Sequence, residues 1–197
     1  KNITADHLGD TAFDVLREGE FAAHVTLLEP GDHNVRNALA AIAAAAELGV
    51  LPEAAAKSLA SYRLTRRRFE RMGSLKGARV FHDYAHHPAE IGACLQGAKS
   101  VCAGRVIAVF QCNSYTRAKT LFSTVQDLRG CFDCAALVLV PDIYPGREVD
   151  TGLVHARDMV AAINESGVKA EYLPTFEEIR ARLDEVVQPE DVVVTLG

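Results

Sequence analysis

Residues 106–110 read VIAVF, and residues 135–140 read AALVLV. Both runs are apolar without alternation, which is typical of strands that are buried on both faces of a parallel sheet. Further apolar runs lie near 78–82, 168–173 and 191–196, and helical stretches separate the runs near 88–100, 117–129, 152–165 and 175–187. This alternation predicts an α/β, Rossmann-like, mostly parallel sheet with helices on both faces over residues 73–197.

Residues 1–72 have a different pattern. Short alternating runs at 13–16 and 22–28, separated by the polar turn REGE, predict a β-hairpin. Two helices are expected next, from Asn34 to Leu48 and from about Pro52 to Ser61. A basic connector then spans residues 62–72, so we place a domain boundary between residues 72 and 73.

Composition excludes several classes of protein. The 197 residues are 49% hydrophobic and 24% charged, which argues against disorder. No apolar run approaches the roughly 18 residues of a membrane span. The net charge of -5 argues against a nucleic acid as the main partner. Since the chain opens on Lys1 without Met and stops at Gly197 after an apolar run, we expect it to be part of a longer protein.

Cysteine usage indicates the compartment. The chain has five cysteines and no secretory segment, which favours free thiols and a cytoplasmic protein. Cys131 and Cys134 form a lone C-x-x-C without the second ligand pair of a zinc site, so we expect a structural role for them.

Polar side chains follow the strand ends, where ligands bind in such sheets. Asp83, after the first strand, could accept hydrogen bonds from ribose hydroxyls or cap the helix after Pro88. His86 and His87 are adjacent, which favours substrate hydrogen bonding or helix entry over a metal site.

Two features of the first 72 residues also bear on function. Arg66, Arg67 and Arg68 form the densest positive charge, which suits either a solvated face or a phosphate clamp. Asn34 and Asn37 share one face of a helix, although Asn34 alone would be assigned as an N-cap. The chain has no G-x-x-x-x-G-K-[ST] phosphate loop, so an ATP-using protein would carry that loop elsewhere.

Several of these segments together resemble the Mur ligases, ATP-dependent ligases of peptidoglycan precursor synthesis. The most specific is DYAHHPAE at 83–90, and the branch that adds L-alanine is the most similar. The other matching segments are GDHNVRNALAA at 31–41, RRFE at 67–70, FQ at 110–111 with YTR at 115–117, and DIY at 142–144 with RE at 147–148 and TG at 151–152.

The resemblance implies an order of domains and a reaction. Residues 1–72 would be the C-terminal part of a central ATP-binding domain, and residues 73–197 the C-terminal Rossmann-like ligase domain. The reaction would join L-alanine to UDP-N-acetylmuramate through an acyl phosphate, with ATP and Mg²⁺. The Mg²⁺ ligands and the N-terminal and central segments of the same protein would lie upstream, so no metal ligand is assigned here. The fragment alone would be inactive.

The resemblance also implies roles for single residues. ATP would be bound by Asn34 at the adenine, Arg68 at the phosphates and Asp83 at the ribose, with Tyr84 near the base. His86 and Arg117 would lie on the substrate side, near the new amide. The residues expected to take part in catalysis are thus Arg68, His86 and Arg117, and His33 and Asn37 would be pocket walls.

One loop departs from the family pattern. Cys112-Asn113 stands where Mur ligases usually have Pro-His, and Ala118 stands where they have Thr. Asn forms hydrogen bonds but cannot carry the charge of a protonated His. Two alternatives stay open: a ligase that recycles murein tripeptide, and a non-catalytic paralogue or nucleotide-binding module.

Overall fold

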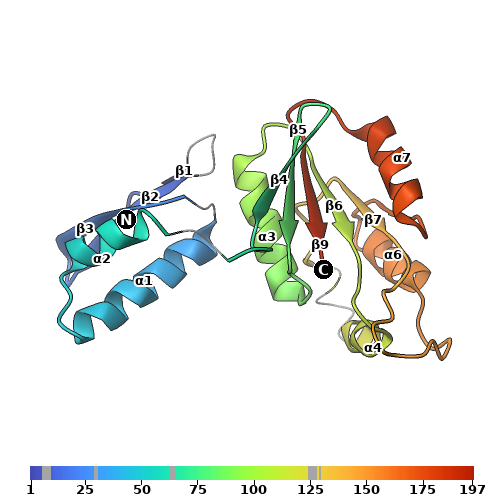
Figure 1. Cartoon of the computed structure of the whole chain (residues 1–197), viewed down its shortest axis with the longest axis horizontal. Helices are drawn as coiled ribbons and strands as arrows, with labels where there is room; N and C mark the ends of the chain where they lie inside the picture. The colour runs from blue at the N-terminus through green and yellow to red at the C-terminus, as the bar shows by residue number, and fades with distance from the viewer. Residues whose placement is uncertain (6–9, 29–30, 63–64, 124–127, 129) are drawn as a thin grey trace. The chain divides into compact units, whose positions relative to one another are not determined.

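The structure, a computed structural model, describes residues 1–5, 10–28, 31–62, 65–123, 128 and 130–197 (Figure 1). It divides the chain into two compact units, Lys1–Thr65 and Arg66–Gly197. The division falls seven residues before the boundary that we expected. The physical reason is strand β4 (Glu70–Leu75), which pairs with β5 (Ala78–Asp83) and so belongs to the second unit.

The first unit is a three-stranded antiparallel sheet with two helices. Strands β1 (Thr4–Ala5), β2 (Thr11–Arg17) and β3 (Glu20–Leu27) lie in that order. The hairpin between β2 and β3 is confirmed. Its two loop residues, Glu18 and Gly19, have φ values of 52° and 94°, as the tight turns favoured in hairpins require.

Helices α1 (Asp32–Glu47) and α2 (Pro52–Leu59) confirm the two expected helices of this unit. Apolar side chains of α1 pack with alternate residues of β2 and β3 in one core. Its largest members are Phe13, Val15, Val25, Leu27, Val35 and Ile42. The N-cap of α1 is Gly31, so Asn34 is not a cap and lies inside the first turn, where it is buried.

The second unit contains a six-stranded sheet in the order β4-β5-β9-β6-β7-β8. Strands β6 (Val106–Phe110), β7 (Leu137–Val140), β8 (Ala170–Tyr172) and β9 (Val192–Leu196) run parallel to β5, and β4 is antiparallel. The predicted α/β fold with a mostly parallel sheet is therefore confirmed. The sequence prediction missed β4, which is mostly exposed and has no apolar alternation to mark it.

Helices cover both faces of this sheet (Figure 1). Apolar residues of α3 (Pro88–Val101) and α6 (Ala156–Glu165) pack on one face, and those of α7 (Phe176–Val186) pack on the other. Helix α6 begins at Ala156 rather than near residue 152, because His155 caps it. Helix α4 (Tyr115–Ser123) begins near the expected position, but the expected end, near residue 129, lies outside the described residues.

All five cysteines are free thiols, as expected. Within the described residues, no helix is long and apolar enough to span a bilayer.

Candidate functional site

The first unit contains a cavity of about 300 Å³ beside α1. Two amide side chains face it from one turn apart on the helix, the buried Asn34 and the exposed Asn37. The other lining residues are mostly apolar: Leu27, Leu28, Ala38, Ala41, Leu59 and Tyr62. Apolar walls with a few polar groups that fix orientation suit a flat heterocycle such as a nucleobase.

Asp83, at the end of β5, is only 7% exposed. Its Oδ2 accepts a hydrogen bond of 2.8 Å from the backbone N–H of Phe69, and its Oδ1 accepts one of 2.7 Å from that of Ala85. The carboxylate therefore fixes the backbone on both sides of it, and each oxygen keeps a second lone pair for another donor. Asp83 does not cap α3; His87 does, in a capping box with Glu90.

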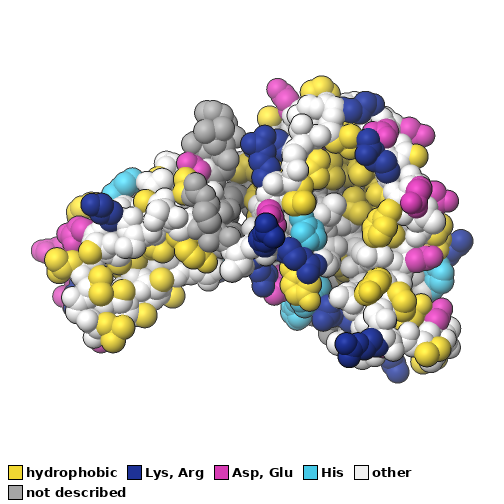
Figure 2. Space-filling view, in the orientation of Figure 1, with side chains coloured by type: hydrophobic (Ala, Val, Ile, Leu, Met, Phe, Trp, Pro, Cys, Tyr) yellow, Lys and Arg dark blue, Asp and Glu magenta, His cyan; other side chains and the backbone are white. Residues whose placement is uncertain are grey.

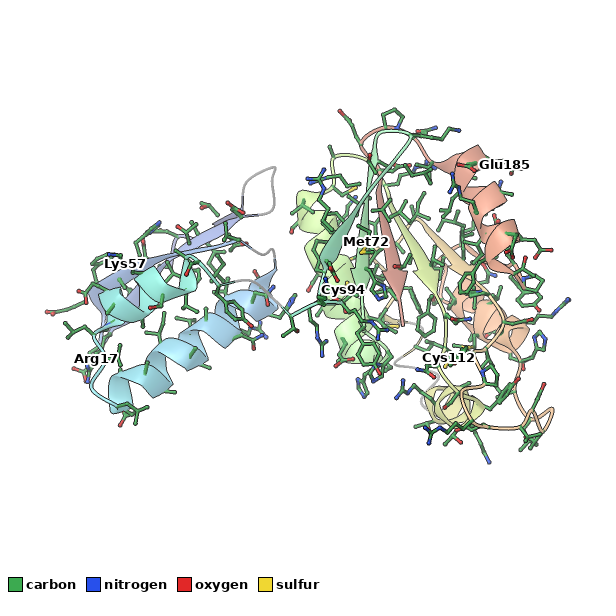
Figure 3. The ribbon with its side chains drawn as sticks, in the orientation of Figure 1. Arg17, Lys57, Met72, Cys94, Cys112 and Glu185 are labelled. Carbon is green, nitrogen blue, oxygen red and sulfur yellow. The ribbon has the colours of Figure 1, made fainter. Side chains whose placement is uncertain are left out.

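A third group near Asp83 is the buried thiol of Cys94 on α3, which is labelled in Figure 3. Burial, followed by the charge of Asp83 and the hydrogen bond to it, raises the pKa of Cys94 well above its ordinary value. The sulfur therefore keeps its proton near the carboxylate.

The segment Arg67–Phe69 precedes β4 and is bound to the end of β5. Arg67 accepts a hydrogen bond of 2.7 Å at its carbonyl from the Tyr84 N–H, and the Phe69 ring stacks on Phe81 with centroids 4.3 Å apart. Arg68, between these two anchored residues, is exposed, and its charge acts on Glu90 and Cys94 of α3. The guanidinium is thus available to bind an anion near the N-terminus of α3.

His86 follows Asp83 and Tyr84 at the same strand end. Its Nδ1 lies 2.8 Å from the Tyr84 carbonyl oxygen, which can only accept, so Nδ1 carries a proton, and in the neutral ring the lone pair is on Nε2. The rings of Tyr84 and His86 meet edge to face at 4.9 Å. Burial opposes the ionisation of Glu90, but hydrogen bonds from the N–H groups of His86 and His87 lower its pKa overall.

Arg117 lies in the first turn of α4, which follows β6. Its Nη1 is buried and has no hydrogen-bond partner within the described residues. Ser114 accepts a hydrogen bond at its hydroxyl from the Arg117 N–H, and Glu148 accepts one of 2.8 Å from the Thr116 N–H. The hydrogen bonds from the Thr116 backbone and side chain lower the pKa of Glu148. An unpaired buried guanidinium nitrogen is costly, which suits a site that receives an anionic ligand.

The contacts described above show which of the predicted residues lie close together. Arg68, Asp83, Tyr84 and His86 form one cluster around the end of β5. Asp83 at the end of β5 and Phe110 at the end of β6 both pair with Leu196 of β9, so the two strands end at the same level. Arg117 follows β6 and therefore lies at the same end of the sheet as this cluster. Figure 2 shows basic and histidine side chains gathered on the surface of this unit.

Asn34 lies in the other unit, and sequence reasoning missed several residues that hold the cluster together. These are Phe69, His82, Glu90 and Glu148, whereas Arg67 was considered only as part of a phosphate clamp. Phe69, Glu90 and Glu148 lie in segments that match the family, and Glu90 had a further signal, since an acidic residue three positions after a helix N-cap is typical of a capping box. Among the described residues, no three His, Cys, Asp or Glu side chains gather to hold a metal ion.

Comparison with known proteins agrees with this architecture. Residues 67–197 match the family Mur ligase, glutamate ligase domain. The whole chain is 42% identical to the UDP-N-acetylmuramate–L-alanine ligase of Caldanaerobacter subterraneus and 41% identical to that of Acetivibrio thermocellus. It spans about 42% and 41% of the length of these relatives.

Solved structures give a similar result. The UDP-N-acetylmuramate–alanine ligase of Thermotoga maritima is 25% identical with a TM-score of 0.72, over 96% of this chain and 40% of that one. A murein peptide ligase from Psychrobacter arcticus is 26% identical with a TM-score of 0.56, over 100% of this chain and 40% of that one. The family match extends over most of the chain, and it coincides with the unit that carries the strand-end cluster. The chain therefore belongs to the Mur ligase family.

Proposed function

We propose that this chain is the C-terminal part of an ATP-dependent ligase that joins L-alanine to UDP-N-acetylmuramate. The observation that carries the proposal is the match of the whole chain, at 42% and 41% identity, to relatives that bear this name. Residues 1–72 would complete a central ATP-binding domain, and residues 73–197 would form the C-terminal ligase domain.

The contacts described above support a role for each ATP-binding residue. Asn34, buried against the apolar cavity, would bind the adenine through its amide, and Asn37 would line the same cavity. Asp83 would accept hydrogen bonds from the ribose through the lone pairs that Phe69 and Ala85 leave unused. Tyr84 would lie near the base.

Arg68 would bind the phosphates, because its exposed guanidinium can donate to two phosphate oxygens at once. ATP supplies the phosphoryl group that makes the muramate carboxylate a better electrophile. Arg68 would stabilise negative charge on the phosphoryl group during this transfer. Carboxylate side chains outside this chain would hold Mg²⁺.

His86 and Arg117 would act on the substrate side. Arg117 has a buried guanidinium nitrogen without a partner in the described structure, so it would bind a substrate carboxylate or phosphate oxygen. The Nε2 lone pair of His86 would accept a proton from the alanine amine as that amine attacks the acyl phosphate. The amide forms and inorganic phosphate leaves.

The murein tripeptide recycling ligase is the second candidate, and the similarity to the Psychrobacter arcticus murein peptide ligase favours it. We prefer the alanine-adding ligase, because two relatives of that name are 42% and 41% identical to this chain, whereas the murein peptide ligase is 26% identical. The two candidates share the nucleotide chemistry and differ in the amine substrate.

Calorimetric titration of the intact gene product with ATP and with AMP tests the ATP assignments. Arg68→Ala should weaken ATP binding about tenfold or more and leave AMP binding nearly unchanged, because it removes a charge-assisted contact to phosphate. Arg71→Ala, which removes an exposed arginine from β4, is the matched control. Equal ATP affinity in the Arg68 and Arg71 variants would contradict the phosphate role.

A further inference from the structure

The two arginines of the RRFE segment have different environments. Arg67 and Phe69 have φ values of 64° and 46°, in the left-handed region that side chains other than glycine seldom adopt. Such a conformation persists only where the surrounding contacts impose it. Arg68, between them, takes its position from the contacts of its two neighbours.

Four consecutive residues at the end of β5 supply these contacts. Phe81 stacks on the ring of Phe69, and Asp83 accepts a hydrogen bond from the Phe69 N–H. Tyr84 donates to the Arg67 carbonyl, and its ring lies 4.3 Å below the Arg67 guanidinium carbon. His82, which lies between Phe81 and Asp83 in the sequence, contacts the Arg67 side chain directly.

Arg67 is exposed, like Arg68, but its guanidinium makes contacts within the protein. Its Nε donates to Nε2 of His82 at 3.2 Å, and its Nη2 donates to the Gly197 carbonyl at 3.1 Å. With the Tyr84 ring under it as well, this side chain is held in place by three groups. Two of its five N–H groups are used in these contacts, so its direction is fixed by the protein.

The contact with Arg67 determines the tautomer of His82. A guanidinium N–H can only donate, so Nε2 of His82 must be the unprotonated acceptor and Nδ1 must carry the proton. Nδ1 lies 2.9 Å from Oγ1 of Thr195 on β9, and that hydroxyl in turn donates to the Phe81 carbonyl at 3.3 Å. Each donor in this chain of hydrogen bonds faces one acceptor.

We propose that Arg67 and His82 are positioning residues that fix the backbone before Arg68 and thereby aim the Arg68 guanidinium at the ATP phosphates. Phe69, held by Phe81 and Asp83, fixes the backbone on the other side. This inference rests on the proposed role of Arg68. It divides the arginine pair into one residue that holds the loop and one that binds the ligand.

The test compares ATP and AMP affinity across variants of the intact gene product. His82→Leu removes the acceptor at similar volume, and Arg67→Ala removes the donor. Each should weaken ATP binding about five- to tenfold with less than about a twofold change for AMP, and the double variant should be no weaker than either single one. His82→Gln, whose side-chain oxygen can accept from Arg67, should restore most of the ATP affinity.

Two outcomes would overturn the proposal. One is an equal loss of ATP and AMP affinity without rescue by His82→Gln, which would indicate a general structural role. The other is unchanged ATP affinity in Arg67→Ala. If Arg68→Ala weakens ATP binding and the Arg67 and His82 variants do not, only this inference fails. If Arg68→Ala itself has no effect, the proposed function of Arg68 fails with it.

Nitrogen NMR of the unmodified protein gives a check that does not depend on folding of the variants. The His82 ring should be neutral, with its proton on Nδ1. A proton on Nε2 near neutral pH would contradict the contact with Arg67.

Discussion

Asp83→Asn should destabilise the protein even without nucleotide. The carboxylate holds two backbone N–H groups at 2.7 and 2.8 Å, and the residue is 7% exposed. An asparagine has the same shape but only one acceptor oxygen, so its NH₂ group must face one of the two N–H donors. The cost combines a lost charge-assisted hydrogen bond with an unpaired buried donor, about 3 kcal/mol in the free energy of unfolding.

The second unit has 132 residues, from Arg66 to Gly197. At roughly 4 °C per kcal/mol for a unit of this size, the midpoint of thermal unfolding should fall by about 12 °C. Thermal and urea unfolding of the intact gene product measure this change, and hydrogen exchange at the Phe69 and Ala85 amides locates it. Asp133→Asn, which neutralises an exposed acid, is the control. An Asp83→Asn protein within about 0.5 kcal/mol of the unmodified protein, with unchanged exchange at both amides, would refute the reasoning.

Four further predictions address the ribose, two ion pairs and the chain alone. Because Asp83 variants disturb the fold, the ribose contact is better tested with 2′,3′-dideoxyATP, which should bind about tenfold or more weakly than ATP; equal affinity would exclude a role for Asp83 at the ribose. Arg182 holds the pKa of Glu171 at about 2, below the ordinary 4.5. Glu171→Gln should therefore lower the free energy of unfolding by about 1 kcal/mol at neutral pH, a small amount because solvent screens the ion pair. This difference should disappear as the pH falls from about 4.5 toward 2, where Glu171 becomes protonated. Unfolding of both proteins measured across this pH range tests the prediction. Asp191 is 2% exposed and accepts hydrogen bonds from Arg105 and the Gln188 N–H. Asp191→Ala should therefore lower the free energy of unfolding in urea by about 3 kcal/mol. A decrease of less than about 1 kcal/mol would contradict this account. The 197 residues alone should show no alanine-dependent ADP formation, and measurable turnover by them would disprove that expectation.

The fold of the second unit could be predicted because its strands have strong local signals. VIAVF at 106–110 lies between β9 and β7 and is buried at every position, as continuous apolar character requires. Strand β4 could not be predicted, since ERMGSL is an exposed edge strand that exists through its pairing with β5. The place of β9 between β5 and β6 was also beyond the sequence, because spacing along the chain does not encode strand order.

The candidate site was predictable only in part. Strand ends identified the neighbourhood of Asp83, His86 and Arg117, because ligands gather at the carboxyl ends of parallel strands. The different environments of Arg67 and Arg68 depend on the register that brings His82 beside the loop. The resemblance to the Mur ligases assigned the phosphates to Arg68, but no local pattern predicts the contacts that hold Arg67. The proximity of Cys94 to Asp83 could not be predicted either, since the two residues are eleven positions apart and come close only after α3 packs on the sheet.

The most direct test of the proposed ligase is phosphate release by the intact gene product with ATP, Mg²⁺ and UDP-N-acetylmuramate. L-alanine, murein tripeptide and no amine are compared in parallel. We predict release that depends on L-alanine, with formation of the UDP-N-acetylmuramoyl-L-alanine product. Release with tripeptide alone would identify the recycling ligase, and no release from a folded protein that binds ATP would contradict a catalytic role.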